Sequence, residues 1–256
     1  MSAPSTRASS TPDPEAVYLY GLVRDPDEAM PDAIEGLDGV RDEPVRLVPH
    51  RGLAALVSAA PGDLASGRKR DLLAHARVLE QVSAATTVLP MQFGMTLADQ
   101  QAVIDELLED DHQRWVALLA RFTGYVELTV KGYHDEDAML RHVAASDPEV
   151  RRQRERPGGS VADRMRLGEA VANALERHRR TDVDMVLERL APLSEKMREN
   201  PAVHEAMTLN ASFLVDREET VRFDREVDAL GRQIGERMRL HWVGPHPPYT
   251  FVAEED

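Results

Sequence analysis

The pattern of apolar and polar residues changes its period near the middle of the chain. Apolar residues follow helical spacing from Trp115 to Phe122, and the sequence Thr123-Gly124 then interrupts them, as at a helix end. From residue 125 apolar and polar positions alternate, with valine or leucine at 126, 128 and 130. This alternation predicts a half-buried strand. A helix that leads into a strand at mid-chain indicates the junction of two α+β halves.

The first half, residues 17–124, contains four apolar stretches that favour strands, at residues 17–23, 45–48, 53–57 and 88–93. Residues 49–52, with the sequence Pro-His-Arg-Gly, provide a turn between the second and third stretches, and Pro90 suits an edge strand or the start of a strand. A weak helix or loop precedes residue 39. Residues 69–87 carry a helical stripe of Leu72, Ala76, Leu79, Val82 and Thr86. The order β, α, β, β, α, β predicts a ferredoxin-like domain, which trailing helices at 98–109 and 112–122 follow.

The second half, residues 125–256, again reads as α+β. A short helix is expected at 135–145, and Ser160 with Asp163 resembles a capping box before a longer helix. That helix carries a heptad-like seam of Val161, Met165, Gly168, Ala172 and Leu175. Thr181 and Asp184 offer a second cap, so two helices are expected to form a projecting antiparallel hairpin within residues 160–199. Strands at 209–215, 240–243 and 249–252, with a helix after Asp216, complete the prediction.

Composition and charge narrow the function classes. The chain of 256 residues has a formal net charge of −14, which disfavours sequence-independent binding of nucleic acid. It contains no cysteine, which excludes disulfides, thiolate ligands and cysteine nucleophiles. No apolar run approaches the ~20 residues of a membrane span, and residues 1–16 are expected to form a disordered tail rather than a signal peptide. These features favour a cytoplasmic protein.

A search for reactive motifs finds no catalytic or cofactor-binding candidate. The sequence has no Gly-rich phosphate loop and no GxSxG nucleophile elbow. His134-Asp135-Glu136-Asp137 superficially resembles a metal cluster, but consecutive residues cannot all converge on one ion, and an acidic helix N-terminus is the preferred interpretation. His204-Glu205 lacks the second histidine of HExxH. The residues themselves therefore provide no candidate catalytic, cofactor-binding or metal site.

Several segments, taken in order, resemble the gas vesicle protein F/L family. They are the sequences VYLYGLV at residue 17, GLAALVS at 52, VLPMQFG at 88, GYVELTVK at 124 and GPHPPYTF at 244. The resemblance covers nearly the whole chain, from Val17 to Val252. It departs from the family at Gln92, where a basic residue is expected, and in the additional N-terminal tail. The sequence does not separate the F-like branch from the L-like branch.

The resemblance implies a non-enzymatic accessory or minor structural protein of gas vesicle assembly. It also implies a location at the gas vesicle, two α+β domains, and the small hydrophobic shell protein and other accessory proteins as partners. Because exposed sheet edges pair with other chains, residues of the apolar strands and of the C-terminal segment are the expected contacts: Leu53, Leu56, Val57, Val88, Met91, Phe93, Tyr249 and Phe251.

Alternatives remain open at this point. For residues 244–252, an edge strand that packs Tyr249 and Phe251 on the core is favoured over an exposed partner contact. For the whole chain, a small-ligand-binding regulatory module or an enzyme on a ferredoxin-like scaffold would also fit the fold class. A pocket with convergent polar groups would favour the enzyme, and stabilisation by a small molecule would favour the regulatory module.

Overall fold

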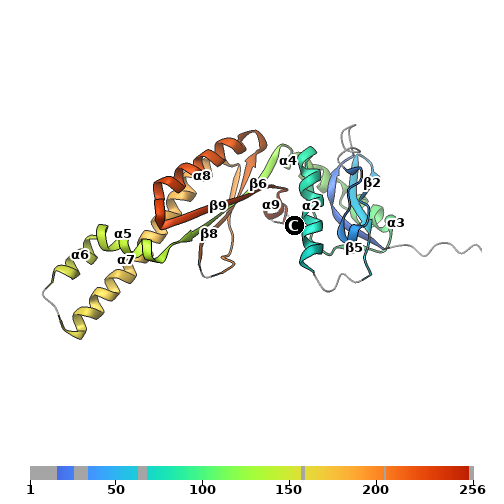
Figure 1. Cartoon of the computed structure of the whole chain (residues 1–256). Helices are drawn as coiled ribbons and strands as arrows, with labels where there is room; N and C mark the ends of the chain where they lie inside the picture. Colours follow the sequence, from blue (N-terminus) through green and yellow to red (C-terminus); the bar gives the residue numbers. More distant parts are fainter. Residues whose placement is uncertain (1–15, 26–33, 63–67, 157–158, 205, 254–256) are drawn as a thin grey trace, which may run out of the picture. The chain divides into compact units, whose positions relative to one another are not determined.

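The computed structural model describes residues 16–25, 34–62, 68–156, 159–204 and 206–253. The predicted tail lies outside these residues except for Ala16, as do residues 26–33 of the predicted weak helix or loop. The chain has an α+β fold and divides into two compact units, Met1–Thr123 and Gly124–Asp256, which are described separately (Figure 1).

The sheet of the first unit contains β1 (Val17–Arg24), β2 (Arg46–His50), β3 (Leu53–Ala59) and β4 (Leu89–Pro90) in the order β2-β3-β1-β4. β5 (Thr96–Leu97) also pairs with β1, and all of these pairs are antiparallel. The predicted hairpin is confirmed: Arg51 and Gly52 join β2 to β3 with φ angles of 48° and 83°, which suit a tight hairpin turn.

The structure differs from the expectations for two of the apolar strands. Residues 53–57, an expected contact strand, have no free edge, because β3 lies between β2 and β1. Residues 88–93 form only the two-residue strand β4, and the chain then turns away before β5. Pro90 does lie at the end of the sheet, where its missing N–H removes no hydrogen bond from an interior pair.

Helices of the first unit supply the remaining core. α2 (Lys69–Ala85) packs on the sheet through Val78, Leu79 and Val82. α3 (Gln100–Ala102), the π-helical segment η2 (Val103–Glu109) and α4 (His112–Phe122) follow the sheet in sequence. Trp115 of α4 is buried and donates its indole N–H to the Leu107 carbonyl over 2.8 Å, which ties α4 to η2.

The stripe predicted for α2 is partly wrong. Leu79 and Val82 are buried, but the side chain of Leu72 is 50% exposed. Asp71 and His75 are buried in its place, because each has a polar partner inside the unit: Arg41 Nε donates to Asp71, and the Tyr18 hydroxyl lies 2.8 Å from His75 Nδ1. Because these polar side chains are paired, the face of α2 that contains them is buried, and this face differs from the predicted apolar stripe.

The second unit contains the strands β6 (Tyr125–His134), β7 (Lys196–Glu199), β8 (Met207–Asp216) and β9 (Met238–His246). Their order is β7-β8-β6-β9, and every pair is antiparallel. α8 (Thr220–Ile234) and the C-terminal part of α7 (Val161–Leu190) bury apolar side chains against one face of this sheet. The short helices η3 (Ala191–Leu193), η4 (Arg217–Glu219) and η5 (Gly235–Arg237) connect these elements.

The prediction of two helices within residues 160–199 is wrong, because α7 is one continuous helix of 30 residues. Its predicted capping box is confirmed, with reciprocal hydrogen bonds between Ser160 and Asp163. Thr181, the expected second cap, lies inside the helix and donates its hydroxyl to the Arg177 carbonyl over 2.9 Å.

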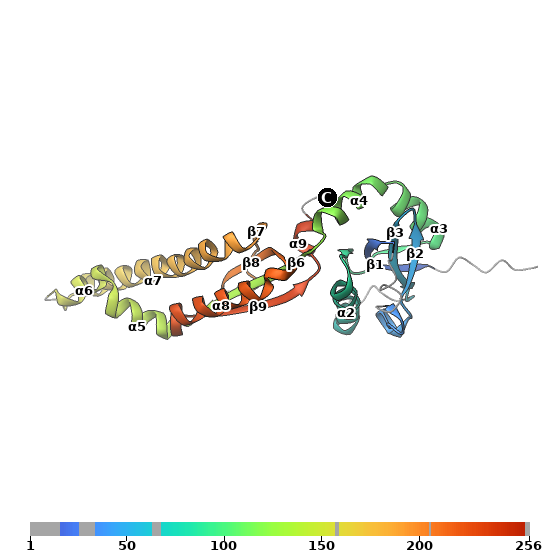
Figure 2. The same ribbon diagram turned by 90° about the horizontal axis from the view of Figure 1, so that it is seen from above.

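A helical projection nevertheless exists, and α7 forms it with α5 (Glu136–Ser146) and α6 (Pro148–Glu155), which lie beside it (Figure 2). Val143 and Val150 pack on Ala170 and Ala174 of α7. Most of the predicted seam is therefore wrong: Val161 and Met165 are 65% and 69% exposed, and a Cβ at Gly168 would meet no atom within 4 Å. Leu175 is the exception, because it packs against this cluster.

The C-terminal segment ends in α9 (Tyr249–Val252), a short helix, so the strand predicted there is wrong. The expectation that Phe251 packs in the core is confirmed, because its side chain is fully buried.

Candidate partner-binding surface

The structure places most of the predicted contact residues inside the molecule. Leu53, Leu56 and Val57 of β3 are at most 1% exposed, and so are Val88 and Phe251. These side chains stabilise their own unit, and a partner could reach them only if that unit opened. Met91 and Phe93 are partly buried, and Tyr249 is 36% exposed. The predicted set therefore does not form one continuous exposed surface.

Phe93 contributes to a buried aromatic cluster below α2. Its ring lies 6.3 Å from the ring of Tyr18 and 5.7 Å from that of His75, both in edge-on contact. The His75 ring also stacks on Tyr20 at 5.4 Å. Burial raises the pKa of Tyr18 to about 12 and lowers the pKa of His75 to about 4, so both side chains are neutral at pH 7. The cluster is thus an uncharged support for α2.

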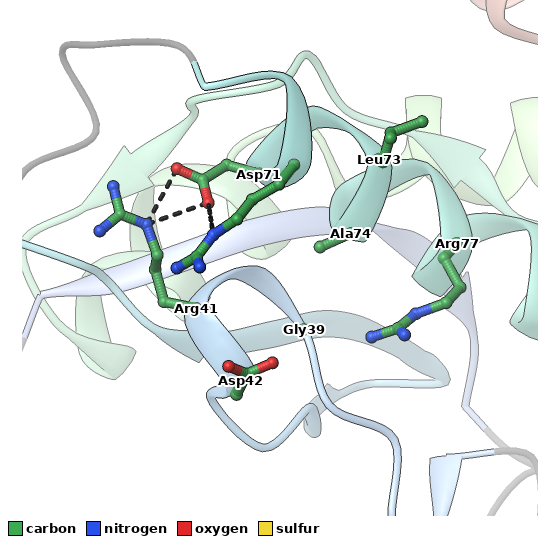
Figure 3. Close-up of a pocket in the computed structure, with 8 residues that line it drawn as sticks. Gly39, Arg41, Asp42, Asp71, Leu73, Ala74 and Arg77 are labelled. Atoms are coloured by element: carbon green, nitrogen blue, oxygen red, sulfur yellow. Dashed lines mark hydrogen bonds and ion pairs between the residues drawn. The ribbon is translucent and has the colours of Figure 1, made fainter.

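A groove beside α2 is a feature that the sequence did not predict. We call it the α2 groove: residues of the 39–42 turn form one wall, residues of α2 form the other, and its volume is about 300 Å³. It is lined by Gly39, Arg41, Asp42, Arg70, Asp71, Leu73, Ala74 and Arg77. Figure 3 shows Arg41 and Arg77 at opposite ends, with Asp71 beside Arg41. Asp71 forms ion pairs with both Arg41 and Arg70.

The turn that forms one wall is held by the hydroxyl of Tyr20. That hydroxyl accepts a hydrogen bond from the Val40 backbone N–H at 2.7 Å and lies 3.0 Å from Ser58 Oγ. Gly39 permits this approach, because a Cβ at that position would lie 1.9 Å from the Tyr20 oxygen. The first wall of the groove is therefore preformed by a buried side chain of β1.

Charged groups organise the base of the groove. Asp71 is 2% exposed, and Arg41 Nε donates to both of its carboxylate oxygens, at 3.0 and 2.9 Å. Arg70 Nε lies 3.5 Å from the same carboxylate, and Arg77 Nη2 donates to the Asp38 carbonyl at 2.8 Å. These pairs position three guanidinium groups along one side of α2.

Two adjacent leucines accompany these arginines. Leu72 and Leu73 are 50% and 58% exposed, and Leu73 belongs to the lining of the groove. Consecutive residues of a helix lie about 100° apart, so one helix face cannot bury both together with Asp71 and His75. Arginine beside exposed leucine is a composition that favours a protein interface rather than a small-molecule site.

His134 and Asp135, in the segment that superficially resembles a metal cluster, have structural partners. His134 Nδ1 lies 2.8 Å from Thr208 Oγ1, and Asp135 caps α5 by accepting the Ala138 N–H at 2.9 Å. This confirms the interpretation of residues 134–137 as a helix N-terminus. Within the described residues, no group of three His, Asp or Glu side chains is arranged to hold a metal ion. None of the described helices has the length and apolar character needed to cross a membrane.

Comparisons with known proteins identify relatives over almost the whole chain. The family described as gas vesicle synthesis protein GvpL/GvpF matches residues 16–253. Gas vesicle protein F of Streptomyces sp. (strain CB03234) is 36% identical over 241 residues, which cover 93% of this chain and 99% of that protein. Gas vesicle protein L of the same strain is 32% identical over 263 residues, covering 93% and 94%. The crystal structure of GvpF from Anabaena sp. PCC7120 superposes with a TM-score of 0.78 at 26% identity, covering 93% of this chain and 98% of that one.

Proposed function

Because the chain belongs to the gas vesicle synthesis protein GvpL/GvpF family, we propose that it is a non-enzymatic accessory protein that binds the small hydrophobic shell protein during gas vesicle assembly. The observation that carries this proposal is the likeness to gas vesicle proteins across both units, since each comparison covers 93% of the chain. A cytoplasmic location at the growing vesicle, among other accessory proteins, follows from the same role.

The chemistry of the described residues supports a binding role. The polar clusters found there are ion pairs and caps that stabilise the fold, such as Arg41 with Asp71 and Asp182 with Arg237. A protein that keeps an apolar subunit from aggregating needs exposed apolar side chains on a charged background. The exposed leucines of α2 and the net charge of −14 supply these two properties.

We infer that the α2 groove, with Leu72 and Leu73, is the principal contact for the shell protein. The groove replaces β3 as the expected site, because β3 is interior and buried. The leucines would bury apolar surface of the subunit, and Arg70 and Arg77 would cover its polar margin with their side-chain stems and donors. Met91, Phe93 and Tyr249 stay secondary candidates on the basis of their partial exposure.

We also infer that each unit is a domain and a variant of the ferredoxin-like arrangement. Counted within its own unit, each sheet places its second, third, first and fourth strands side by side, all antiparallel. In the second unit the first helical connection contains α5, α6 and α7 and so carries the projection. Each sheet keeps terminal strands, such as β2 and β7, which could add backbone pairing to the contact.

Co-expression with a tagged shell protein tests the proposal. The wild-type chain should co-purify with it. Leu72→Ser with Leu73→Ser should reduce recovery at least about tenfold, since burying each leucine is worth roughly 1–2 kcal/mol. Val116→Ser on α4 and Val221→Ser on α8 are matched controls, because these valines are 40% and 58% exposed outside the groove. Undiminished recovery of the leucine variant would move the contact away from α2, whereas failure of the wild type to co-purify would contradict the proposed function.

A further inference from the structure

The sheet of the second unit has two faces of different character. Leu128, Val130 and Phe213 point to the face that α7 and α8 cover. The strand register places the alternate residues on the opposite face, where Thr129 pairs with Ser212 and Lys131 with Asn210. We call this opposite face the polar sheet face. Its middle is polar: Thr129, Lys131 and Asn210 are half-buried, and Ser212 is buried, with its hydroxyl 3.3 Å from that of Thr250.

Basic side chains gather on the polar sheet face. The register places Lys131 of β6, Arg239 and His241 of β9, and Lys196 and Arg198 of β7 on it. Its acidic side chains are Glu127 and Asp216, and both accept hydrogen bonds. Glu127 is 5% exposed and accepts from the N–H and the hydroxyl of Thr250 at 2.8 and 2.6 Å. Asp216 accepts from the Glu218 N–H at 2.9 Å. Arg198 also donates to the Thr250 carbonyl at 3.4 Å. The strands thus place four lysine and arginine side chains and two carboxylates on this face, a net positive charge on a chain whose net charge is −14.

An aromatic cluster lies on the same face. The ring of Tyr133 stacks on His204 with a centroid distance of 5.4 Å, and the His241 ring meets it edge-on at 6.0 Å. By the register, Tyr133 is opposite Arg239, and Lys131 is opposite His241. Rigid rings beside cationic groups give a surface that can order a peptide backbone while the cations bind its carboxylates.

We propose that the polar sheet face binds an extended acidic segment of a partner protein. Charge complementarity identifies the occupant: carboxylates neutralise the basic residues of the face, and the rest of this acidic chain repels a long polyanion such as nucleic acid. Four strands about 4.8 Å apart span roughly 15 Å, which accommodates about four to five extended residues. A short run of Asp or Glu matches this length. The proposal goes beyond shell-protein binding and uses a surface in the other unit.

Fluorescence anisotropy with the full-length chain tests the proposal. The probes are labelled octaglutamate, octaglutamine and an eight-nucleotide oligothymidine, in 50 mM salt. We expect octaglutamate to bind, octaglutamine and oligothymidine to bind at least about tenfold more weakly, and 500 mM salt to abolish binding, because screening shortens to a few ångströms at high ionic strength. Equal binding of octaglutamate and octaglutamine would overturn the proposal, and tighter binding of oligothymidine would replace it with a nucleic-acid surface.

Variants localise the binding to this face. Lys131→Gln with Arg239→Gln should weaken octaglutamate binding about five- to tenfold. Arg152→Gln with Arg222→Gln removes the same charge from α6 and α8, where these side chains are 72% and 70% exposed, and should change binding less than twofold. If the Lys131 and Arg239 variant unfolds, Arg198→Gln at the end strand β7 should still weaken binding. An equal loss in the control pair would show that only net charge matters and would refute the assignment.

Discussion

Acidification should destabilise the first unit through His75, a buried histidine of α2. His75 is 2% exposed, its Nε2 lies 3.2 Å from the Met91 carbonyl and its Nδ1 lies 2.8 Å from the Tyr18 hydroxyl. Nε2 therefore carries the proton and Nδ1 accepts from Tyr18. Burial lowers the pKa of His75 from 6.5 to about 4, although the bond to Met91 opposes this shift. A second proton, on Nδ1, would prevent the Tyr18 hydroxyl from donating there and would place a positive charge in the core.

The sign and size of the effect follow from the two pKa values. Between pH 6.5 and about 4 the unfolded chain binds a proton at His75 that the folded chain does not, so the free energy of unfolding falls as the pH falls through this window. Each pKa unit corresponds to about 1.4 kcal/mol, which gives a loss of about 3 kcal/mol by pH 4. Above pH 6.5 His75 contributes no pH dependence.

Urea unfolding at several pH values between 7.5 and 4.5 measures this loss. Trp115 fluorescence reports on the first unit if Trp242→Phe is present in every protein compared, because Trp242 belongs to the second unit. His75→Gln is the control, since its amide can accept from Tyr18 and donate to Met91 without titrating. The wild type should lose more stability than this variant as the pH falls, by up to about 3 kcal/mol. Identical pH dependence in the two proteins would refute the assignment of a neutral, buried His75.

Two further predictions concern the second unit. Ala174→Leu should destabilise this unit by about 1–3 kcal/mol in thermal or urea unfolding, because Ala174 is fully buried where α7 packs on its neighbours. Gly168→Ala should be neutral or stabilising, because this helix position is open. A larger loss of stability from Gly168→Ala than from Ala174→Leu would contradict the packing of α7 through Ala170 and Ala174. Asp182→Ala should cost about 3–5 kcal/mol, because it leaves the guanidinium of Arg237 without its two bonds of 2.7 and 3.2 Å; a loss below 1 kcal/mol in the same assay would show that the pair is dispensable.

Asp182 should also stay ionised well into the acidic range. Burial alone would raise the pKa of its carboxyl, but the hydrogen bonds from His134 and Arg237 outweigh burial and leave that pKa below its ordinary value. The carboxylate is therefore paired rather than neutralised, which explains why a charged residue can occupy the middle of α7.

Local features of the fold could be predicted from the sequence where one residue type determines the geometry. The hairpin followed from Gly52 between two apolar runs, and the start of α7 followed from the Ser160 and Asp163 box. Alternation gave β6 and β8 because each has one apolar and one polar face. In each of these cases the physical cause lies within a few residues of the chain.

The predictions that were wrong concern features of the fold that depend on residues far apart in the sequence. Whether a strand can reach a partner depends on the strands beside it, so the apolar run of β3 alone did not exclude it as a contact. Asp71 and His75 could enter the core of the first unit only because Arg41 and Tyr18 meet them there. Thr181 is compatible with either a cap or a helix interior, and packing against α5, α6 and α8 selects the continuous helix.

The α2 groove could not be found from sequence patterns for the same reason. Arg41 and Arg70 are 29 residues apart in the sequence and meet at one carboxylate in the fold. The available signal was the pair Leu72-Leu73 beside a polar stretch, since only one face of a helix can be buried. Identification of the exposed leucines required knowledge of which face packs on the sheet.

Deletion and complementation of the gene in a gas vesicle-forming host test the central claim most directly. Vesicle formation would be measured by flotation and electron microscopy. If the chain is an accessory protein of assembly, its deletion should abolish vesicles and the full-length chain should restore them. The variant with Leu72→Ser and Leu73→Ser should restore vesicles poorly, whereas the Val116→Ser variant should restore them fully. Normal vesicles in the deletion strain would contradict the proposed role in assembly.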